Sequence, residues 1–246
     1  MKTKFFQKIQ DATLLACTIA AALFAIFTIF TLLTLVVDVR AIGPFGSKVG
    51  FSKLNLNAWQ AMGRSETWYK VSEIMGLLTI LAAVAFVGLG VWQLIRRKSL
   101  RKIDPAIWLL GLLYVCLAGT YAVFELIIVN YRPILVEGVL EASYPSSHTM
   151  LVCGVMGSAI VAVWHIFASK IVRISATAVA SVVTVLTLVG RMLSGVHWLT
   201  DIIGGVLIAA ALVAAYLTAV MAARDLRKAE ESKTDTPESV ESVNPF

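Results

Sequence analysis

Three polar stretches in an otherwise apolar chain carry residues suited to phosphate chemistry. They are "NYRPI" at 130–134, "YPSSH" at 144–148 and "GRMLSGVHWLTD" at 190–201. Two of the chain's three histidines and two arginines lie in them. Imidazoles can attack phosphorus or move protons, and arginines bind phosphate oxygens through paired N–H donors. If the fold brings the stretches together, they predict a site for phosphoryl transfer.

His197 and Asp201 are four residues apart. On a helix they share one face, so the carboxylate can bond one imidazole nitrogen and fix the tautomer. The other nitrogen is then free to act as a nucleophile. A lone pair of this kind is more often structural than catalytic, so the pair by itself leaves both interpretations open.

Arg132 and Arg191 can clamp phosphate oxygens with their planar guanidinium groups. Arg191 precedes His197 by six residues, and Ser194-Gly195 between them offers a break that can turn Arg191 back toward the same point. The alternative for Arg132, which is followed by proline, is an interfacial anchor beside a helix stop.

Ser146 and Ser147 precede an apolar run. A serine there can simply cap a helix. The same helix N-terminus can hold a phosphate, because its free N–H groups point toward the anion. The stretch alone does not choose between these two roles.

The composition indicates a membrane protein. Of 246 residues, 59% are hydrophobic and only 15% are charged, against about 25% charged in typical soluble domains. The three cysteines lie in apolar runs and predict neither a disulfide framework nor a metal site. No cofactor is expected.

Six apolar segments are long enough to cross a bilayer, which takes about 20 residues. They cover 12–37, 71–95, 105–129, 149–168, 174–193 and 199–222. The first is too long for a signal peptide and is interpreted as a retained span. The sequence therefore predicts an all-α, six-span bundle over 1–223, followed by a disordered cytoplasmic tail over 224–246, which is rich in Lys, Glu, Ser, Thr and Pro.

The distribution of basic residues predicts the orientation of the spans. With the N-terminus inside, 14 of the 21 Lys and Arg residues are cytoplasmic, which places both termini inside and the three motifs outside. Cytoplasmic anchoring accounts for most of the net charge of +6, so no nucleic-acid partner is implied. The only long outer loop is 38–70, and its second half is expected to form an interfacial helix or a simple connector.

The motifs resemble those of a known family. Arg132-Pro133, then Pro145-Ser146-Ser147-His148, then Arg191 with His197 and Asp201, are similar to the three-part signature of the type 2 phosphatidic-acid phosphatases. These are integral membrane lipid phosphatases with a six-span layout. The resemblance covers most of the chain except the tail and the first outer loop.

The resemblance implies a role for each motif residue. His197 would be the nucleophile that forms a phosphohistidine, oriented by Asp201, and His148 would protonate the leaving alcohol. The phosphate would be bound by Arg132, Ser146 and Arg191, with Ser147 beside them. No metal is required in this family.

Three positions depart from the family pattern. Ser147 stands where the family usually has glycine, and Gly190 where it has serine. The family's first motif begins with lysine seven residues before the arginine, and here that residue is Glu125. Seven residues return to nearly the same helix face, so Glu125 is expected near Arg132. Of its possible roles, we favour pairing with an arginine over protonation or a position too deep to matter.

The sequence thus predicts a metal-independent phosphatase of lipid phosphates or diphosphates at the outer leaflet of the plasma membrane. Its partners are the bilayer and the lipid substrate, and the residues carry no signal for the oligomeric state. Two alternatives remain at this stage. One is a lipid phosphotransferase of the same fold, and the other is a non-catalytic, transporter-like membrane protein.

Overall fold

Helices make up most of the computed structural model, which describes residues 2–234. Its long helices are α1 (Lys2–Val36), α3 (Glu66–Arg97), α4 (Pro105–Leu126), α5 (Ser147–Ile166), α6 (Lys170–Leu193) and α7 (Leu199–Thr234). Its short elements are α2 (Ser52–Met62), the two-stranded hairpin β1 (Arg40–Ala41) and β2 (Lys48–Val49), and two 3₁₀ turns at Pro44–Gly46 and Leu100–Lys102.

Six of the helices are long and apolar enough to cross a membrane, which confirms the predicted six-span, all-α fold. The candidate spans are Gln10–Val36, Glu66–Arg97, Pro105–Leu126, Ser147–Ile166, Lys170–Leu193 and Leu199–Arg227. The second begins five residues earlier than predicted, because the Ser65 side chain accepts the N–H of Trp68 and caps the helix. The chain is a multi-pass integral membrane protein.

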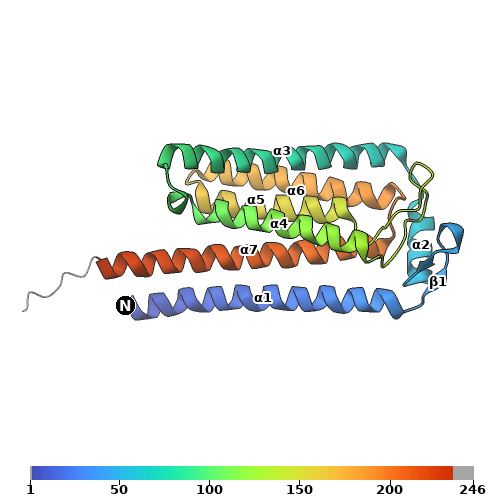
Figure 1. Cartoon of the computed structure of the whole chain (residues 1–246), viewed down its shortest axis with the longest axis horizontal. Helices are drawn as coiled ribbons and strands as arrows, with labels where there is room; N and C mark the ends of the chain where they lie inside the picture. The colour runs from blue at the N-terminus through green and yellow to red at the C-terminus, as the bar shows by residue number, and fades with distance from the viewer. Residues whose placement is uncertain (1, 235–246) are drawn as a thin grey trace, which may run out of the picture.

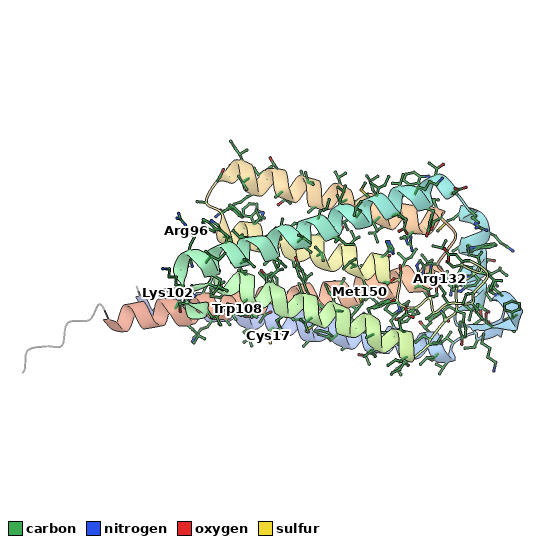
Figure 2. The ribbon with its side chains drawn as sticks, turned by 45° about the horizontal axis from the view of Figure 1, so that its top comes forward. Cys17, Arg96, Lys102, Trp108, Arg132 and Met150 are labelled. Atoms are coloured by element: carbon green, nitrogen blue, oxygen red, sulfur yellow. The ribbon has the colours of Figure 1, made fainter. Side chains whose placement is uncertain are left out.

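The spans lie side by side in one bundle. Figure 1 shows α1 and α7 together along one edge, α3 along the opposite edge, and α2 with β1 at one end of the bundle. We call this the motif end, because the loops 127–146 and 194–198 also lie there. Figure 2 places Arg132 at the motif end, and Arg96 and Lys102 at the opposite end. Apolar residues fill the bundle between the two ends, and buried polar residues gather at the motif end.

The last span continues into the predicted tail. Helix α7 runs to Thr234, so the disordered segment expected from residue 224 is helical over its first residues. The stretch begins "RDLRKAEES", and Ala, Leu, Arg, Lys and Glu all favour helix, which lets the span continue beyond its apolar part. The rest of the predicted tail, 235–246, lies outside the described residues.

The first long loop also differs from the expectation. Helix α2 occupies 52–62 and ends at Gly63. The φ of Gly63 is 71°, a backbone conformation that is strained for any residue with a side chain. The following residues, from Glu66, already belong to α3. The loop therefore contains a helix, but it ends at Met62 and excludes the "ETWYK" segment, which opens α3.

The connection between α4 and α5 folds over the motif end as an irregular hairpin. Backbone hydrogen bonds join Arg132 to Glu141 and Ser143 to Asn130 across it. A further backbone bond, from Ser146 N–H to the carbonyl of Asp201, ties the start of α5 to α7 at 2.9 Å. These bonds bring the first and second motifs against the third.

Candidate active site

The three motifs meet at one point of the motif end. Arg132 comes from the α4–α5 connection, His148 from the first turn of α5, Arg191 from the last turn of α6 and His197 from the turn before α7. Arg132, Ser147 and His197 line one small cavity, together with Glu125 and Ser143. The predicted convergence of the motif side chains is therefore present in the structure.

His197 is buried, with 4% of its surface exposed, and its Nδ1 atom faces a serine. Ser143 Oγ lies 3.1 Å from Nδ1 and donates a hydrogen bond to Asp201 Oδ2. Asp201 Oδ2 itself is 3.8 Å from Nδ1, too far for a hydrogen bond. The expected direct contact is thus replaced by a bridge through Ser143. The helix-spacing argument fails because α7 begins at Leu199 and His197 precedes it.

The bridge assigns the tautomer of His197. Since the Ser143 proton goes to Asp201, its oxygen must accept the Nδ1–H of the imidazole. Nε2 then carries the lone pair and accepts a hydrogen bond from Arg191 Nη2 at 3.4 Å, so it lies directly beside the guanidinium group. Burial lowers the pKa of His197 well below its usual value, and the charges of Arg191 and Arg132 act in the same direction. The imidazole is therefore neutral at physiological pH, as a nucleophile requires.

Asp201 is fully buried in a network of polar side chains. Its Oδ2 also accepts the N–H of Trp198 at 2.9 Å, and its Oδ1 accepts from Asn130 Nδ2 at 3.2 Å. Asn130 and Asn55 both donate to the hydroxyl of Thr200, and Asn55 lies on α2. The first long loop therefore helps to fix the carboxylate, a role that its sequence did not reveal.

Arg191 is 2% exposed and is held by the first turns of α3. Its Nη1 donates to Glu73 Oε1 at 2.9 Å and to Ser72 Oγ at 3.3 Å. Its guanidinium carbon lies 5.5 Å from the centre of the Tyr69 ring, a cation–π contact. Its buried Nε atom has no hydrogen-bond acceptor among the described residues. One donor of this buried cation is thus free for an anion.

Arg132 is paired with Glu141 rather than with Glu125. Its Nε atom lies 3.1 Å from Glu141 Oε2, an ion pair whose geometry does not qualify as a hydrogen bond. Glu125 is exposed and forms no ion pair with any described residue. The favoured pairing role is therefore not seen in the structure. The reason is that α4 ends at Leu126, so the seven-residue helical spacing to Arg132 does not apply.

The start of α5 combines a cap with open N–H groups. Ser146 is buried and its Oγ accepts the N–H of Thr149 at 3.4 Å, which confirms the capping role predicted for this pair of serines. Ser147 and His148 follow as the first helical residues, where backbone N–H groups have no partner within the helix. His148 points its Nε2 toward Glu73 Oε1, 3.3 Å away.

Comparison with known proteins agrees with this geometry. The sequence model of the PAP2 superfamily matches residues 129–225, which contain all three motifs. The resemblance read from the motifs is thereby confirmed.

The fold of the chain is also similar to that of a solved structure. The crystal structure of a transmembrane PAP2-type phosphatidylglycerolphosphate phosphatase from Bacillus subtilis superposes with a TM-score of 0.57 at 21% identity, covering 89% of this chain and 98% of that one. The crystal structure of LpxE from Aquifex aeolicus matches with a TM-score of 0.42 at 21% identity, over 67% of this chain and 94% of that one. No curated protein matches the chain.

Sequence reasoning missed three residues of the candidate site: Glu73, Ser143 and Asn130. Glu73 had a usable signal, since an acidic residue inside the apolar run of a span is usually functional. Ser143 and Asn130 carry no such signal. Their contacts join positions 58 and 71 residues apart, which only the folded chain reveals.

Proposed function

We propose that this protein hydrolyses a phosphate or diphosphate group from a membrane lipid. The observation that carries the proposal is the convergence of a neutral nucleophile with a free anion donor. His197 Nε2 lies 3.4 Å from Arg191, whose buried Nε has no acceptor within the described part of the chain. A phosphate in this place would accept from Arg191 and Arg132 while its phosphorus faces the Nε2 lone pair.

The reaction would proceed in two steps. His197 Nε2 forms a bond to phosphorus while the bond from phosphorus to the lipid oxygen breaks, and His148 gives its proton to that oxygen. Water then attacks the phosphohistidine, His148 takes a proton from the water, and His197 Nε2 is released with phosphate. Arg132 and Arg191 neutralise the charge that gathers on the phosphoryl oxygens. The N–H groups at the start of α5 add neutral donors.

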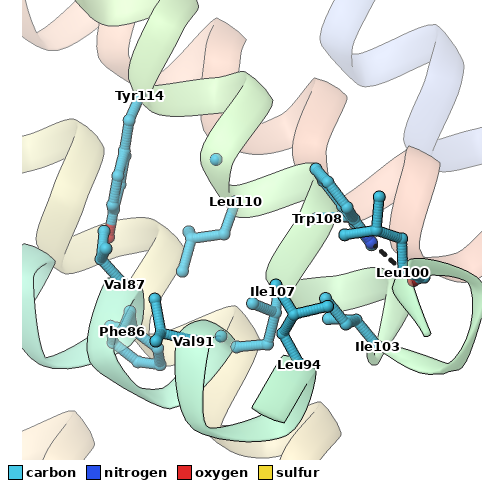
Figure 3. Close-up of a pocket in the computed structure, with 12 residues that line it drawn as sticks. Phe86, Val87, Val91, Leu94, Leu100, Ile103, Ile107, Trp108, Leu110 and Tyr114 are labelled. Carbon is cyan, nitrogen blue, oxygen red and sulfur yellow. Dashed lines mark hydrogen bonds between the residues drawn. The ribbon is translucent and has the colours of Figure 1, made fainter. Parts of the chain in front are cut away.

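A lipid tail has a place beside the site. His148 and Ser147 line an apolar cavity of about 420 Å³ between α3, α4 and α5. Its walls include Ala83, Leu117 and Leu151, which suit an acyl or prenyl chain. Tyr114 also lines a second apolar pocket, which includes Trp108 (Figure 3). A headgroup at His197 and a tail along the spans would fit a lipid held in the bilayer.

The proposed site faces the outer leaflet of the plasma membrane, with both termini in the cytoplasm and residues 1–223 forming the phosphatase domain. The Lys/Arg asymmetry of the loops supports this orientation. A cysteine introduced in the loop 38–70 should react with an impermeant thiol reagent on intact cells, and one at Lys98 should not. The reverse pattern would move the site to the cytoplasm.

The activity test uses purified protein in detergent with a panel of lipid phosphates: phosphatidate, phosphatidylglycerol phosphate and polyprenyl diphosphate. The wild-type chain should release inorganic phosphate from at least one of them, and His197→Ala should not. Transfer of the phosphate to an added alcohol instead of water would identify a phosphotransferase. Equal release by both proteins would contradict the proposal.

A further inference from the structure

One face of α3 contacts both the phosphate-binding arginine and the second motif. Tyr69, Ser72 and Glu73 lie at the spacing of one helix face, and all three contact Arg191. This segment lies outside residues 129–225, which the PAP2 family model matches. The first turns of α3 are thus an additional wall of the site.

A single carboxylate oxygen on this wall serves two partners. Glu73 Oε1 accepts from Arg191 Nη1 at 2.9 Å and lies 3.3 Å from His148 Nε2. The helix allows this approach because Gly76, one turn later, has no side chain: a Cβ there would lie 3.2 Å from the imidazole ring of His148. The imidazole therefore packs directly on the backbone of α3, with its Nε2 edge toward Glu73.

We propose that Glu73 is a positioning residue of the active site, which ties the proton donor His148 to the phosphate-binding Arg191. The inference rests on the proposed phosphatase function. Arg191 is almost completely buried, and Glu73 is the only carboxylate within 4.0 Å of it among the described residues. Without this partner the guanidinium has a charge without a counter-ion and is free to change its orientation.

The tie has a chemical consequence. An oxygen that contacts both partners holds the imidazole of His148 close to the donors of Arg191, and the oxygen between lipid and phosphorus must lie beside both groups during transfer. Glu73 thus aligns proton donation with phosphate binding. Its loss should harm reactions in which the leaving group needs a proton more than those in which it does not.

The first experiment compares two leaving groups in Glu73→Ala and Glu73→Gln. An alkyl lipid phosphate needs protonation of its leaving oxygen, whereas p-nitrophenyl phosphate has a leaving group stable as an anion. We expect Glu73→Ala to lose about 100-fold in kcat with the lipid and less than about fivefold with the aryl ester, since a general acid typically contributes 10²–10⁴-fold. Glu73→Gln keeps an acceptor oxygen and should lie between Glu73→Ala and wild type.

The matched control is Glu66→Gln. Glu66 lies on the same helix but pairs with Lys70 on the exposed surface, so both substrates should react as with wild type. An equal loss with both substrates in the Glu73 variants, or no loss with either, would overturn the positioning role.

A binding experiment tests Glu73 without turnover. Orthovanadate should stabilise the purified protein against heat, and its apparent affinity should fall roughly tenfold in Glu73→Ala, because Arg191 is no longer held in place. Tighter binding of vanadate in Glu73→Ala would show that the carboxylate only repels anions, and it would overturn the proposal. If wild type binds vanadate but releases no phosphate from any lipid, the phosphatase function fails while this test of Glu73 still gives an answer.

Discussion

Replacing Ser143 by alanine should show whether Asp201 orients His197 through the Ser143 hydroxyl or by direct contact. Ser143 Oγ accepts from His197 Nδ1 and donates to Asp201 Oδ2, so it joins these two groups. Ser143→Ala leaves Nδ1–H without a close acceptor, since the carboxylate is 3.8 Å away. The imidazole then loses the contact that fixes both its tautomer and its orientation.

The size of the effect follows from the bonds removed. A hydrogen bond to a charged group contributes about 1.5–3 kcal/mol, and about 1.4 kcal/mol corresponds to tenfold in rate. We therefore expect kcat to fall roughly 10- to 150-fold. Asp201 keeps its bonds from Trp198 and Asn130, so the loss should be smaller than the several orders of magnitude expected for Asp201→Ala. KM should change little, because Ser143 is not among the proposed phosphate ligands.

The assay is the rate of phosphate release by purified variants at saturating lipid phosphate. The control is Ser158→Ala, which also removes a buried serine hydroxyl but only one bonded to the carbonyl of Val155 within α5. Activity of Ser143→Ala within about threefold of wild type would refute the bridge. It would mean that Asp201 closes the 3.8 Å gap and orients His197 directly.

Three further predictions concern pH, Glu125 and metals. The pKa of His197 is lower in the folded chain than its unfolded value of about 6.5. Below pH 6.5 the unfolded state therefore binds a proton that the folded state does not, and the free energy of unfolding falls by up to about 1.4 kcal/mol per pH unit as the pH falls. Between pH 7 and pH 5 the midpoint temperature of thermal unfolding should therefore fall more steeply for wild type than for His197→Gln. Parallel curves of midpoint temperature against pH would contradict the burial argument. Glu125 shares a cavity with Arg132 and His197 but forms no ion pair with an arginine of the described residues 2–234. Glu125→Gln should therefore tighten vanadate inhibition by roughly two- to tenfold, and weaker inhibition would restore the steering role. Because two arginines make up the proposed phosphate site, phosphate release should be unchanged by EDTA, and a loss restored by magnesium would count against the assignment.

The sequence predicted the spans and the convergence of the motifs, because both depend on patterns that a single chain displays. Apolar runs of about 20 residues identify membrane helices without knowledge of their neighbours. With an even number of spans, the first and the last helix start and finish at the same end of the bundle, as Figure 1 shows for α1 and α7. Alternate loops then lie together at the other end. The six-span fold and the meeting of Arg132, His148, Arg191 and His197 follow from this.

The contacts within the site could not be predicted in the same way. The expected bond from His197 to Asp201 and the expected partnership of Glu125 both assumed helical spacing across a helix boundary. Helix α7 begins after His197, and α4 ends before Arg132. The true partner of Arg191 lies 118 residues away on α3, and no local pattern connects them.

The central claim is that His197 carries the phosphoryl group. Purified protein is mixed with a lipid phosphate labelled with ³²P and quenched in base within one turnover, because a phosphohistidine survives base and is lost in acid. The account predicts base-stable label on the peptide that contains His197, absent from His197→Ala and still formed in Ser158→Ala. Label on another residue, or full turnover by His197→Ala, would contradict it.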